Sequence, residues 1–132
     1  MTTPAVQELK AFVPARDFAL AKRFYTALGF IQKSDGGGVA YFHCGDYAFL
    51  LHETDDPQAA AHCSMHLLVP DVHAWFDHVR AADLTGYAHV RIGGLQEQPW
   101  GMTEFTLTDP NGVCWHIAQN TPGFAPVGRI VP

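Results

Sequence analysis

The sequence has few charged residues and no long hydrophobic run. Only 16% of its 132 residues are charged, against about 25% in an average soluble domain, whereas 48% are apolar. An apolar share of this size predicts a packed core and argues against an intrinsically disordered chain. No apolar stretch approaches the roughly 18 residues of a membrane-spanning helix, and the first residues lack the features of a signal peptide. We therefore expect one soluble, cytoplasmic domain over residues 1–132, without a membrane partner.

Basic residues are scarce, and several familiar catalytic motifs are missing. The chain has 8 Lys and Arg against 13 Asp and Glu, which gives a net charge of −5. Nucleic-acid-binding proteins usually carry a basic stripe, so we predict no nucleic-acid partner. The sequence also contains no Gly-x-Ser-x-Gly elbow, phosphate-binding loop or dinucleotide fingerprint.

Cysteine is also sparse and gives no sign of a metal finger. Cys44, Cys63 and Cys114 are an odd number without zinc-site spacing, and we interpret them as buried thiols in a reducing compartment. A catalytic thiol would need a base beside it. His43 precedes Cys44, but adjacent residues of a strand point to opposite faces, so this pair is a weak candidate for nucleophilic catalysis.

The first half of the chain combines one amphipathic helix with four strands. Asp17 is placed to cap the helix, and Gly29 to end it. The apolar stripe between them has helical spacing and consists of Ala21, Phe24, Tyr25 and Leu28. Strands are expected over residues 9–14, 30–33, 39–43 and 47–53.

The second half repeats this plan. Asp71 is the expected helix cap, and the stripe consists of Val72, Trp75, Phe76 and Val79. Strands are expected over residues 63–69, 87–92, 103–108 and 113–118, with a loop over 93–101. We therefore predict an α+β fold of two βαβββ modules, about 8–54 and 62–119, with an irregular tail over 120–132. The modules would form a curved, mixed-sheet cup with the helices outside. Such a cup could hold a small ligand, be buried in a dimer, or both.

Several motifs resemble a known family. Phe24-Tyr25, Leu28-Gly29-Phe30 and the turn over 109–112 are similar to the vicinal oxygen chelate superfamily, which includes glyoxalase I, extradiol dioxygenases and bleomycin resistance proteins. Residues 15–17 and 97–116 are most similar to the bleomycin resistance proteins. The resemblance implies the paired-module fold and spans roughly residues 10–119.

The resemblance also tells where a metal would be held. In metal-dependent members, a ligand lies seven residues before each helix-capping aspartate, which here gives Lys10 and Ser64. The last-strand ligand, usually glutamate, falls on His116, and the remaining one falls near Leu50 or Leu51. Lysine repels a cation and serine is rarely a ligand. We therefore predict no metal site of the superfamily type and no cofactor.

Two histidines remain as candidates for the cup. His66 lies two residues after Ser64, so both would share one strand face, and His116 would also point inward. The two histidines could form a displaced metal site with His52 or Glu104, or an acid–base pair. Alternatively, they are polar walls of a pocket, as the resemblance to metal-free bleomycin resistance proteins implies.

The resemblance implies a homodimer that sequesters a bulky, cationic, drug-like ligand in a groove between subunits. The acidic chain would attract such a ligand, and Trp100, between Pro99 and Gly101, could stack on it or close the loop over the core. Known drug-binding members carry aromatic rings where this chain has Ser64 and His66, which points to weaker binding of planar thiazoles or to a different ligand. The predicted ligand-binding residues are Trp100, Gly101, His66, His116, Glu104 and Ser64.

Other interpretations stay open. Glu104 could instead pair with Arg16 or a backbone amide. The second functional hypothesis is a divalent-metal lyase, isomerase or dioxygenase with a non-standard ligand set. The third is a cup that serves only dimerisation or binding of a partner protein.

Overall fold

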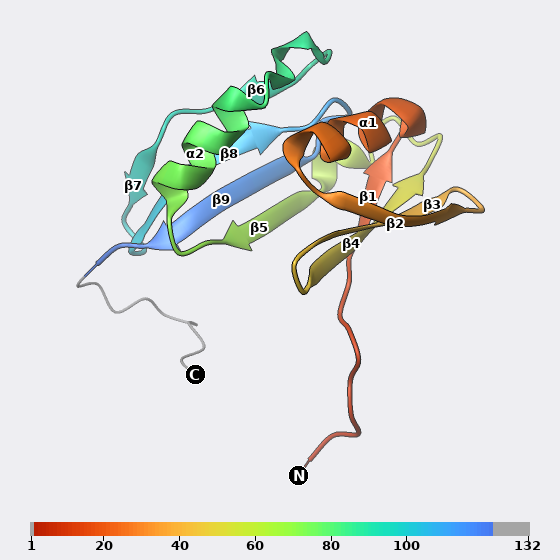
Figure 1. Ribbon diagram of the computed structural model, residues 1–132, viewed down its shortest axis with the longest axis horizontal. Coiled ribbons are helices and arrows are strands. Elements are labelled where there is room, and N and C mark those ends of the chain that lie inside the picture. The colour runs from red at the N-terminus through yellow and green to blue at the C-terminus, as the bar shows by residue number, and fades with distance from the viewer. Residues whose placement is uncertain (1, 123–132) are drawn as a thin grey trace.

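The computed structural model describes residues 2–122. Its first module, module one, contains one helix and a four-stranded sheet (Figure 1). The strands lie in the order β1-β4-β3-β2; β1 runs parallel to β4 and the other pairs are antiparallel. The elements are β1 (Phe12–Ala15), α1 (Phe18–Leu28), β2 (Ile31–Gly36), β3 (Val39–Cys44) and β4 (Tyr47–Glu53).

Module two repeats the arrangement. Its main strands lie in the order β5-β9-β8-β6, with β5 parallel to β9, and β7 pairs with β8 beside this path. The elements are β5 (Ser64–Leu68), α2 (Val72–Ala81), β6 (Arg91–Ile92), β7 (Gln96–Gln98), β8 (Met102–Thr108) and β9 (Cys114–Asn120). The predicted α+β fold with paired modules is confirmed.

The helix ends follow the predicted capping residues. The Asp17 carboxylate accepts a hydrogen bond of 3.1 Å from the amide of Leu20, and Asp71 accepts one of 3.0 Å from Ala74. Gly29 ends α1 in the left-handed region with φ 111°, a conformation that costs glycine little. Both helices therefore begin where a side-chain oxygen satisfies an amide that the helix leaves free.

Both helices lie on the same side of the sheets (Figure 1) and cover a shared hydrophobic core. The Tyr25 ring of α1 lies 5.0 Å from Phe49 of module one and 5.8 Å from Trp115 of module two. On α2, Phe76 packs edge-on against Phe105 of β8, at 5.1 Å between ring centroids. Within residues 2–122, no helix covers the opposite sides of the sheets, which we call the open faces.

Some predicted boundaries were wrong. The strand expected over 9–14 begins only at Phe12, and the strand expected over 87–92 is reduced to the two residues of β6 after a short 3-10 helix. The loop expected over 93–101 contains β7, and β9 continues to Asn120 into the predicted tail. Residues 123–132 of that tail lie outside the described residues. None of the helices within 2–122 is long and apolar enough to span a membrane.

Candidate ligand-binding site

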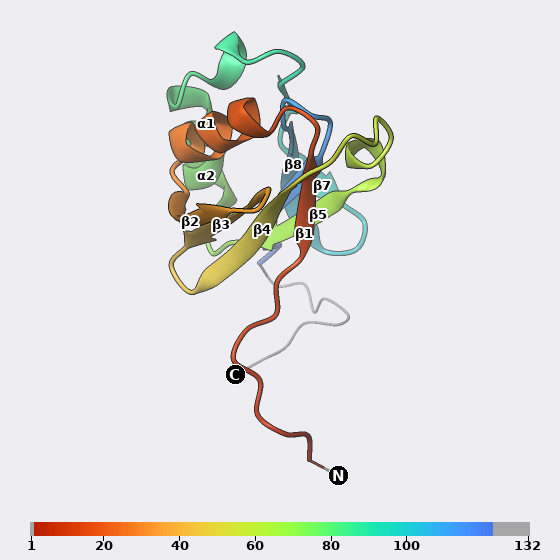
Figure 2. The ribbon, with the colours of Figure 1, turned by 90° about the vertical axis from the view of Figure 1, so that its right-hand side faces the viewer.

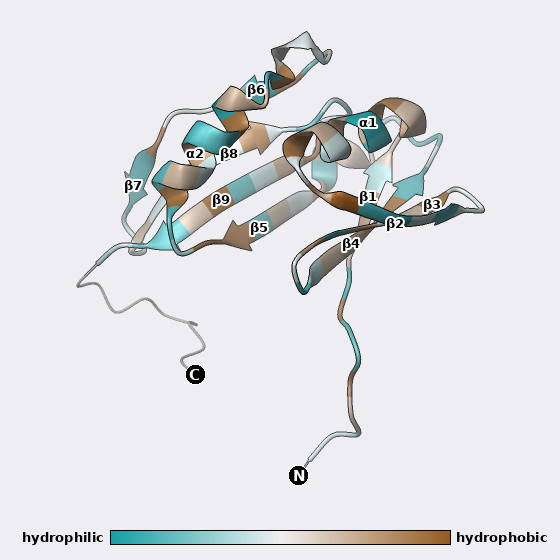
Figure 3. Ribbon diagram, in the orientation of Figure 1, coloured by the Kyte–Doolittle hydropathy of each residue, from teal (hydrophilic) through white to brown (hydrophobic). Residues whose placement is uncertain are grey.

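The open face of the second sheet gathers polar side chains in rows. Residues paired across neighbouring strands point to the same side, and this side changes at each step along a strand. Bands of hydrophobic and hydrophilic residues on β5 and β9 reflect this alternation (Figure 3). Three rows cross β5, β9 and β8, and they consist of Ser64, Cys114 and Thr108; His66, His116 and Thr106; and Leu68, Ala118 and Glu104.

Four of the six predicted ligand-binding residues share this face, namely Ser64, His66, Glu104 and His116. Trp100 and Gly101 lie elsewhere, on the turn between β7 and β8 at the end of the sheet. Thr106, the partner of His116, is four strand residues beyond Met102, which places it about 13 Å from that turn. The Trp100 side chain is 54% exposed and can contact a ligand only if the ligand extends along the sheet.

His116 is the centre of a chain of three polar side chains. Its Nδ1 lies 2.8 Å from Oε2 of Glu104, and its Nε2 lies 3.7 Å from Sγ of Cys114. Glu104 is 5% exposed, whereas His116 is at the surface of the face. In the neutral tautomer that carries its proton on Nδ1, His116 donates a hydrogen bond to the Glu104 carboxylate and directs the lone pair of Nε2 at the thiol. Glu104 therefore pairs with His116, and the alternative pairing with Arg16 was wrong.

Cys114 is a functional candidate that the sequence interpretation missed. All three cysteines are free, as expected, but they are only partly buried, so the interpretation as buried thiols was wrong in their burial. Burial raises the pKa of Cys114, and the negative charge of Glu104 adds to this effect. The signal was present in the sequence, because residues two apart on a strand share a face.

An apolar crevice of 550 Å³ lies between the two modules, at the β5 edge of the second sheet. It separates the start of β4 from β5 and is closed on one side by α2. Five of its 13 lining residues are aromatic, and Tyr47 among them is 77% exposed. His66 belongs to both the crevice and the row with His116. The lining residues used below are Tyr47, Phe49, Met65, His66, Trp75 and Trp115.

The donor set does not fit the metal centre of the superfamily. The pair His66–His116 in module two corresponds to Phe12–Leu50 in module one, because His66 and Phe12 each lie five residues before a helix cap. The fourth expected ligand position, which the sequence placed at Leu50 or Leu51, is therefore Leu50. Three of the four expected positions thus hold Leu50, Lys10 and Ser64, and these side chains do not form a metal-binding set. Within residues 2–122, no group of three or more His, Cys, Asp or Glu is placed to hold a metal ion.

His52 does not join the two cup histidines. It lies on β4 of the first sheet, where its ring contacts Phe12 edge-on at 5.6 Å. Of the two proposed partners, His52 and Glu104, it is Glu104 that contacts His116.

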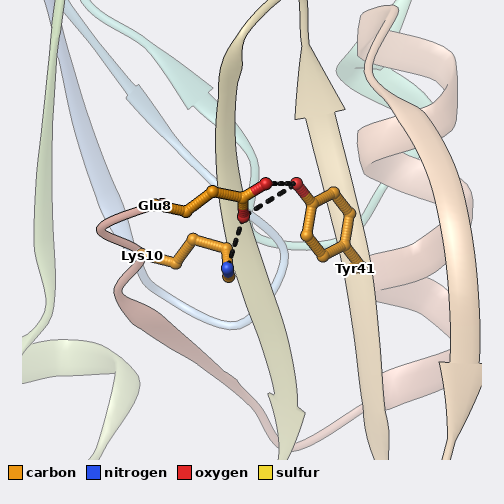
Figure 4. Close-up of polar contacts among 3 residues, drawn as sticks. All are labelled: Glu8, Lys10 and Tyr41. Carbon is orange, nitrogen blue, oxygen red and sulfur yellow. Dashed lines mark hydrogen bonds and ion pairs between the residues drawn. The ribbon is translucent and has the colours of Figure 1, made fainter. Parts of the chain in front are cut away.

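The N-terminal segment leads away from the sheets toward the N-terminus (Figure 2), whereas Glu8 and Lys10, closer to β1, contact the open face of the first sheet. The hydroxyl of Tyr41 on β3 lies 2.9 and 3.1 Å from the two carboxylate oxygens of Glu8, which also pairs with Lys10 (Figure 4). These contacts hold the pKa of Glu8 below its usual value, chiefly through Lys10 and then Tyr41. The hydroxyl of Tyr41 is therefore already hydrogen-bonded to Glu8 of the same chain.

Two βαβββ modules with an open polar face and an aromatic crevice define a paired-module α+β protein suited to small ligands. Residues 8–117 match the family model described as the Glyoxalase/Bleomycin resistance protein/Dioxygenase superfamily, and the chain belongs to this family.

Relatives within the family include drug-resistance proteins. The chain is 30% identical over 114 residues to a bleomycin resistance protein of Klebsiella pneumoniae, a match covering 82% of this chain and 88% of that one. The crystal structure of a bleomycin-binding protein complexed with bleomycin is similar with a TM-score of 0.75 and 26% identity, covering 87% of this chain and 99% of the other. A bleomycin resistance determinant encoded on the transposon Tn5 also has a TM-score of 0.75, with 25% identity and coverage of 87% and 98%.

Proposed function

We propose that the protein binds and sequesters a bulky, cationic, drug-like molecule as a cytoplasmic homodimer, without a metal ion. The observation that carries this proposal is the likeness to a bleomycin-binding protein that holds bleomycin, over 99% of that chain at 26% identity. The 30% identity to the bleomycin resistance protein of Klebsiella pneumoniae also supports it.

The chemistry of the site supports a binding role. A crevice of 550 Å³ lies within the range of roughly 300–1,000 Å³ for drug-sized ligands. Its aromatic lining offers flat surfaces on which a heteroaromatic group stacks. The net charge of −5 attracts a cation over a distance set by the salt concentration.

Exposed apolar side chains support a dimer. Phe12 on the first sheet is 61% exposed, and Leu68 on the open face of the second is 49% exposed. A second copy laid over these faces would cover both residues and would add a second wall for a ligand larger than the crevice. Sedimentation equilibrium should therefore give twice the mass of one chain, and a Leu68→Glu variant should shift the protein toward the monomer. A stable wild-type monomer at micromolar concentration would remove the inter-subunit groove from the proposal.

The free state of the three cysteines supports a reducing compartment. No observation at the four ligand positions favours the metal-dependent enzyme, since three of them hold lysine, leucine and serine. Metal analysis after native purification separates the two functions. The binding protein should contain less than stoichiometric metal, whereas near-stoichiometric metal that a chelator removes would favour the enzyme.

Intrinsic fluorescence gives a direct test of binding. Trp75 and Trp115 line the crevice, and Trp100 is exposed on the turn, so a bound heteroaromatic ligand should change the emission. We expect a saturable change on addition of metal-free bleomycin in the presence of EDTA. A linear response without saturation, matched by free tryptophan, would contradict the proposed ligand.

A further inference from the structure

We propose that Cys114 is a nucleophile, activated by His116 and positioned through Glu104, that captures α,β-unsaturated carbonyl compounds covalently on the open face of the second sheet. This inference adds bond formation to the reversible binding proposed above, and it rests on that function only in that a ligand in the crevice extends past His66 to the row of His116. The site is defined by three side chains on two adjacent strands, β8 and β9.

The arrangement has the parts of an activated thiol. A nucleophile within hydrogen-bond reach of a base, which a third group orients, is the usual sign of nucleophilic catalysis. Here the base is Nε2 of His116, 3.7 Å from the sulfur, and the orienting group is Glu104, 2.8 Å from Nδ1. Glu104 is buried and the His116 side chain is 36% exposed, so the carboxylate holds the imidazole from the buried side, and Cys114 is itself partly exposed.

The other two cysteines lack this arrangement. The neighbour of Cys44, His43, directs its Nδ1 to the carbonyl oxygen of Gly45 at 3.1 Å. Burial and the negative charge of Asp109 raise the pKa of Cys63, as burial and Glu104 do for Cys114, so the difference between these two thiols is the imidazole contact and not the pKa. Within the described residues, the contact between a thiol and an imidazole ring is found at Cys114. The chain thus contains two internal controls for thiol reactivity.

The neighbouring side chains suit a polarised carbonyl compound. Ser64 and Thr108 share the row of Cys114 on either side, so two hydroxyl groups lie where they can donate hydrogen bonds to a carbonyl oxygen. Arg91, which pairs with Thr108, extends this row. The titratable or charged residues around the Cys114–His116 pair are therefore His66 on β5, Glu104 on β8 and Arg91 on β6.

The capture step is balanced without an oxidant or a metal. The sulfur of Cys114 forms a bond to the β-carbon of the unsaturated carbonyl compound, and the electron pair of the carbon–carbon double bond moves to the α-carbon. Nε2 of His116 takes the thiol proton as the bond forms, and Glu104 stabilises the resulting imidazolium. His116 then returns the proton to the α-carbon, which leaves a neutral thioether. The product is a covalent adduct with all the atoms of the ligand.

Alkylation by N-ethylmaleimide, a simple member of this chemical class, tests the inference on the whole native protein. Peptide mass spectrometry gives separate rate constants for the three cysteines in one reaction. We expect Cys114 to react at least about tenfold faster than Cys44 and Cys63, and His116→Ala to slow Cys114 by about tenfold or more, since a positioned base typically contributes about 100-fold or more. Removing the ring also opens space, so a purely steric effect would increase the rate. Equal rates for the three cysteines, or an unchanged rate in His116→Ala, would overturn the inference.

The role of Glu104 is tested by the pH profile of the same reaction. Glu104→Gln keeps an acceptor for Nδ1 but removes the negative charge that raises the pKa of Cys114, so the rise of the Cys114 rate with pH should begin at a lower pH than in the wild type. A carboxylate that only filled space would leave the profile unchanged. Circular dichroism should show that the variants are folded, and Cys44 should keep its wild-type rate in each as a second check.

The drug titration and the alkylation separate the two proposals. Bleomycin binding with an inert Cys114 would leave the sequestering function standing and end the covalent inference. A fast, His116-dependent Cys114 in a protein that does not bind bleomycin would retain the reactive site and assign it to another ligand.

Discussion

The hydroxyl of Tyr25 donates a hydrogen bond of 2.6 Å to Oδ2 of Asp109 and so ties α1 of module one to the last turn of module two. The same hydroxyl accepts a bond of 2.9 Å from Nε1 of Trp115. The other oxygen of Asp109 accepts from the backbone amides of Asn111 and Val113, at 2.8 and 2.9 Å. Burial raises the pKa of Tyr25 and of Asp109. These hydrogen bonds therefore offset the cost of removing both polar groups from water. The link therefore keeps the two modules in register around the core.

Removing this hydroxyl should destabilise the fold. Tyr25→Phe leaves a donor on Trp115 and an acceptor on Asp109 without a partner, and each such buried group costs about 1–3 kcal/mol. We expect a fall of about 2–4 kcal/mol in the free energy of unfolding, measured by urea denaturation. Tyr47→Phe is the matched control, because Tyr47 is 77% exposed and should lose almost nothing. Equal denaturation midpoints for the two variants would contradict the role of the Tyr25 hydroxyl.

The contacts of Glu8 should depend on pH in a defined direction. Its pKa in the folded protein lies below the ordinary value of 4.5, chiefly because of Lys10. The contribution of these contacts is therefore present above pH 4.5 and is lost as the pH falls through the lower, folded value. The Glu8 carboxyl carbon, followed by NMR, should titrate below 4.5 in the wild type and move back toward 4.5 in Lys10→Met.

Lys33 provides the control for that titration. It lowers the pKa of Glu8 only through a weaker charge effect, so Lys33→Met should move the midpoint less than Lys10→Met. The same midpoint in wild type and Lys10→Met would show that the cluster in Figure 4 does not persist in solution.

Trp100 should contribute to ligand binding but not to stability. Because the ring is 54% exposed on the turn between β7 and β8, its loss removes little packing. If the ring stacks on the ligand, Trp100→Ala should weaken binding by about 1–3 kcal/mol, with an unchanged free energy of unfolding. Trp100→Phe retains an aromatic face and should recover part of the loss. Unchanged affinity in Trp100→Ala, measured by calorimetry, would make the residue a structural part of the turn.

The fold was largely predictable because local signals and packing agree. The capping residues Asp17 and Asp71 and the left-handed Gly29 act through their own backbone neighbourhood, which the sequence displays directly. In contrast, β7 (Gln96–Gln98) has no apolar alternation, and only its pairing with β8 makes it a strand. Pairing between distant segments cannot be derived from local residue patterns.

The candidate site was predictable in part for the same reason. Alternation along one strand was sufficient to place Ser64 and His66 on one face, and the pairing of β5 with β9 adds His116 to it. The contact between Glu104 and His116 depends on the register of β8 against β9, which the sequence does not specify. The crevice required still more, because Tyr47 and Trp75 come together only when the two modules are packed.

Calorimetric titration of the purified protein with bleomycin tests the central proposal most directly. Sequestration predicts saturation at one ligand per subunit, a submicromolar dissociation constant and weaker binding at higher salt, since an acidic protein would then be screened from a cationic ligand. Absence of saturable heat at two temperatures, with the protein shown to be folded, would contradict bleomycin as the ligand. The site would then belong to another small molecule.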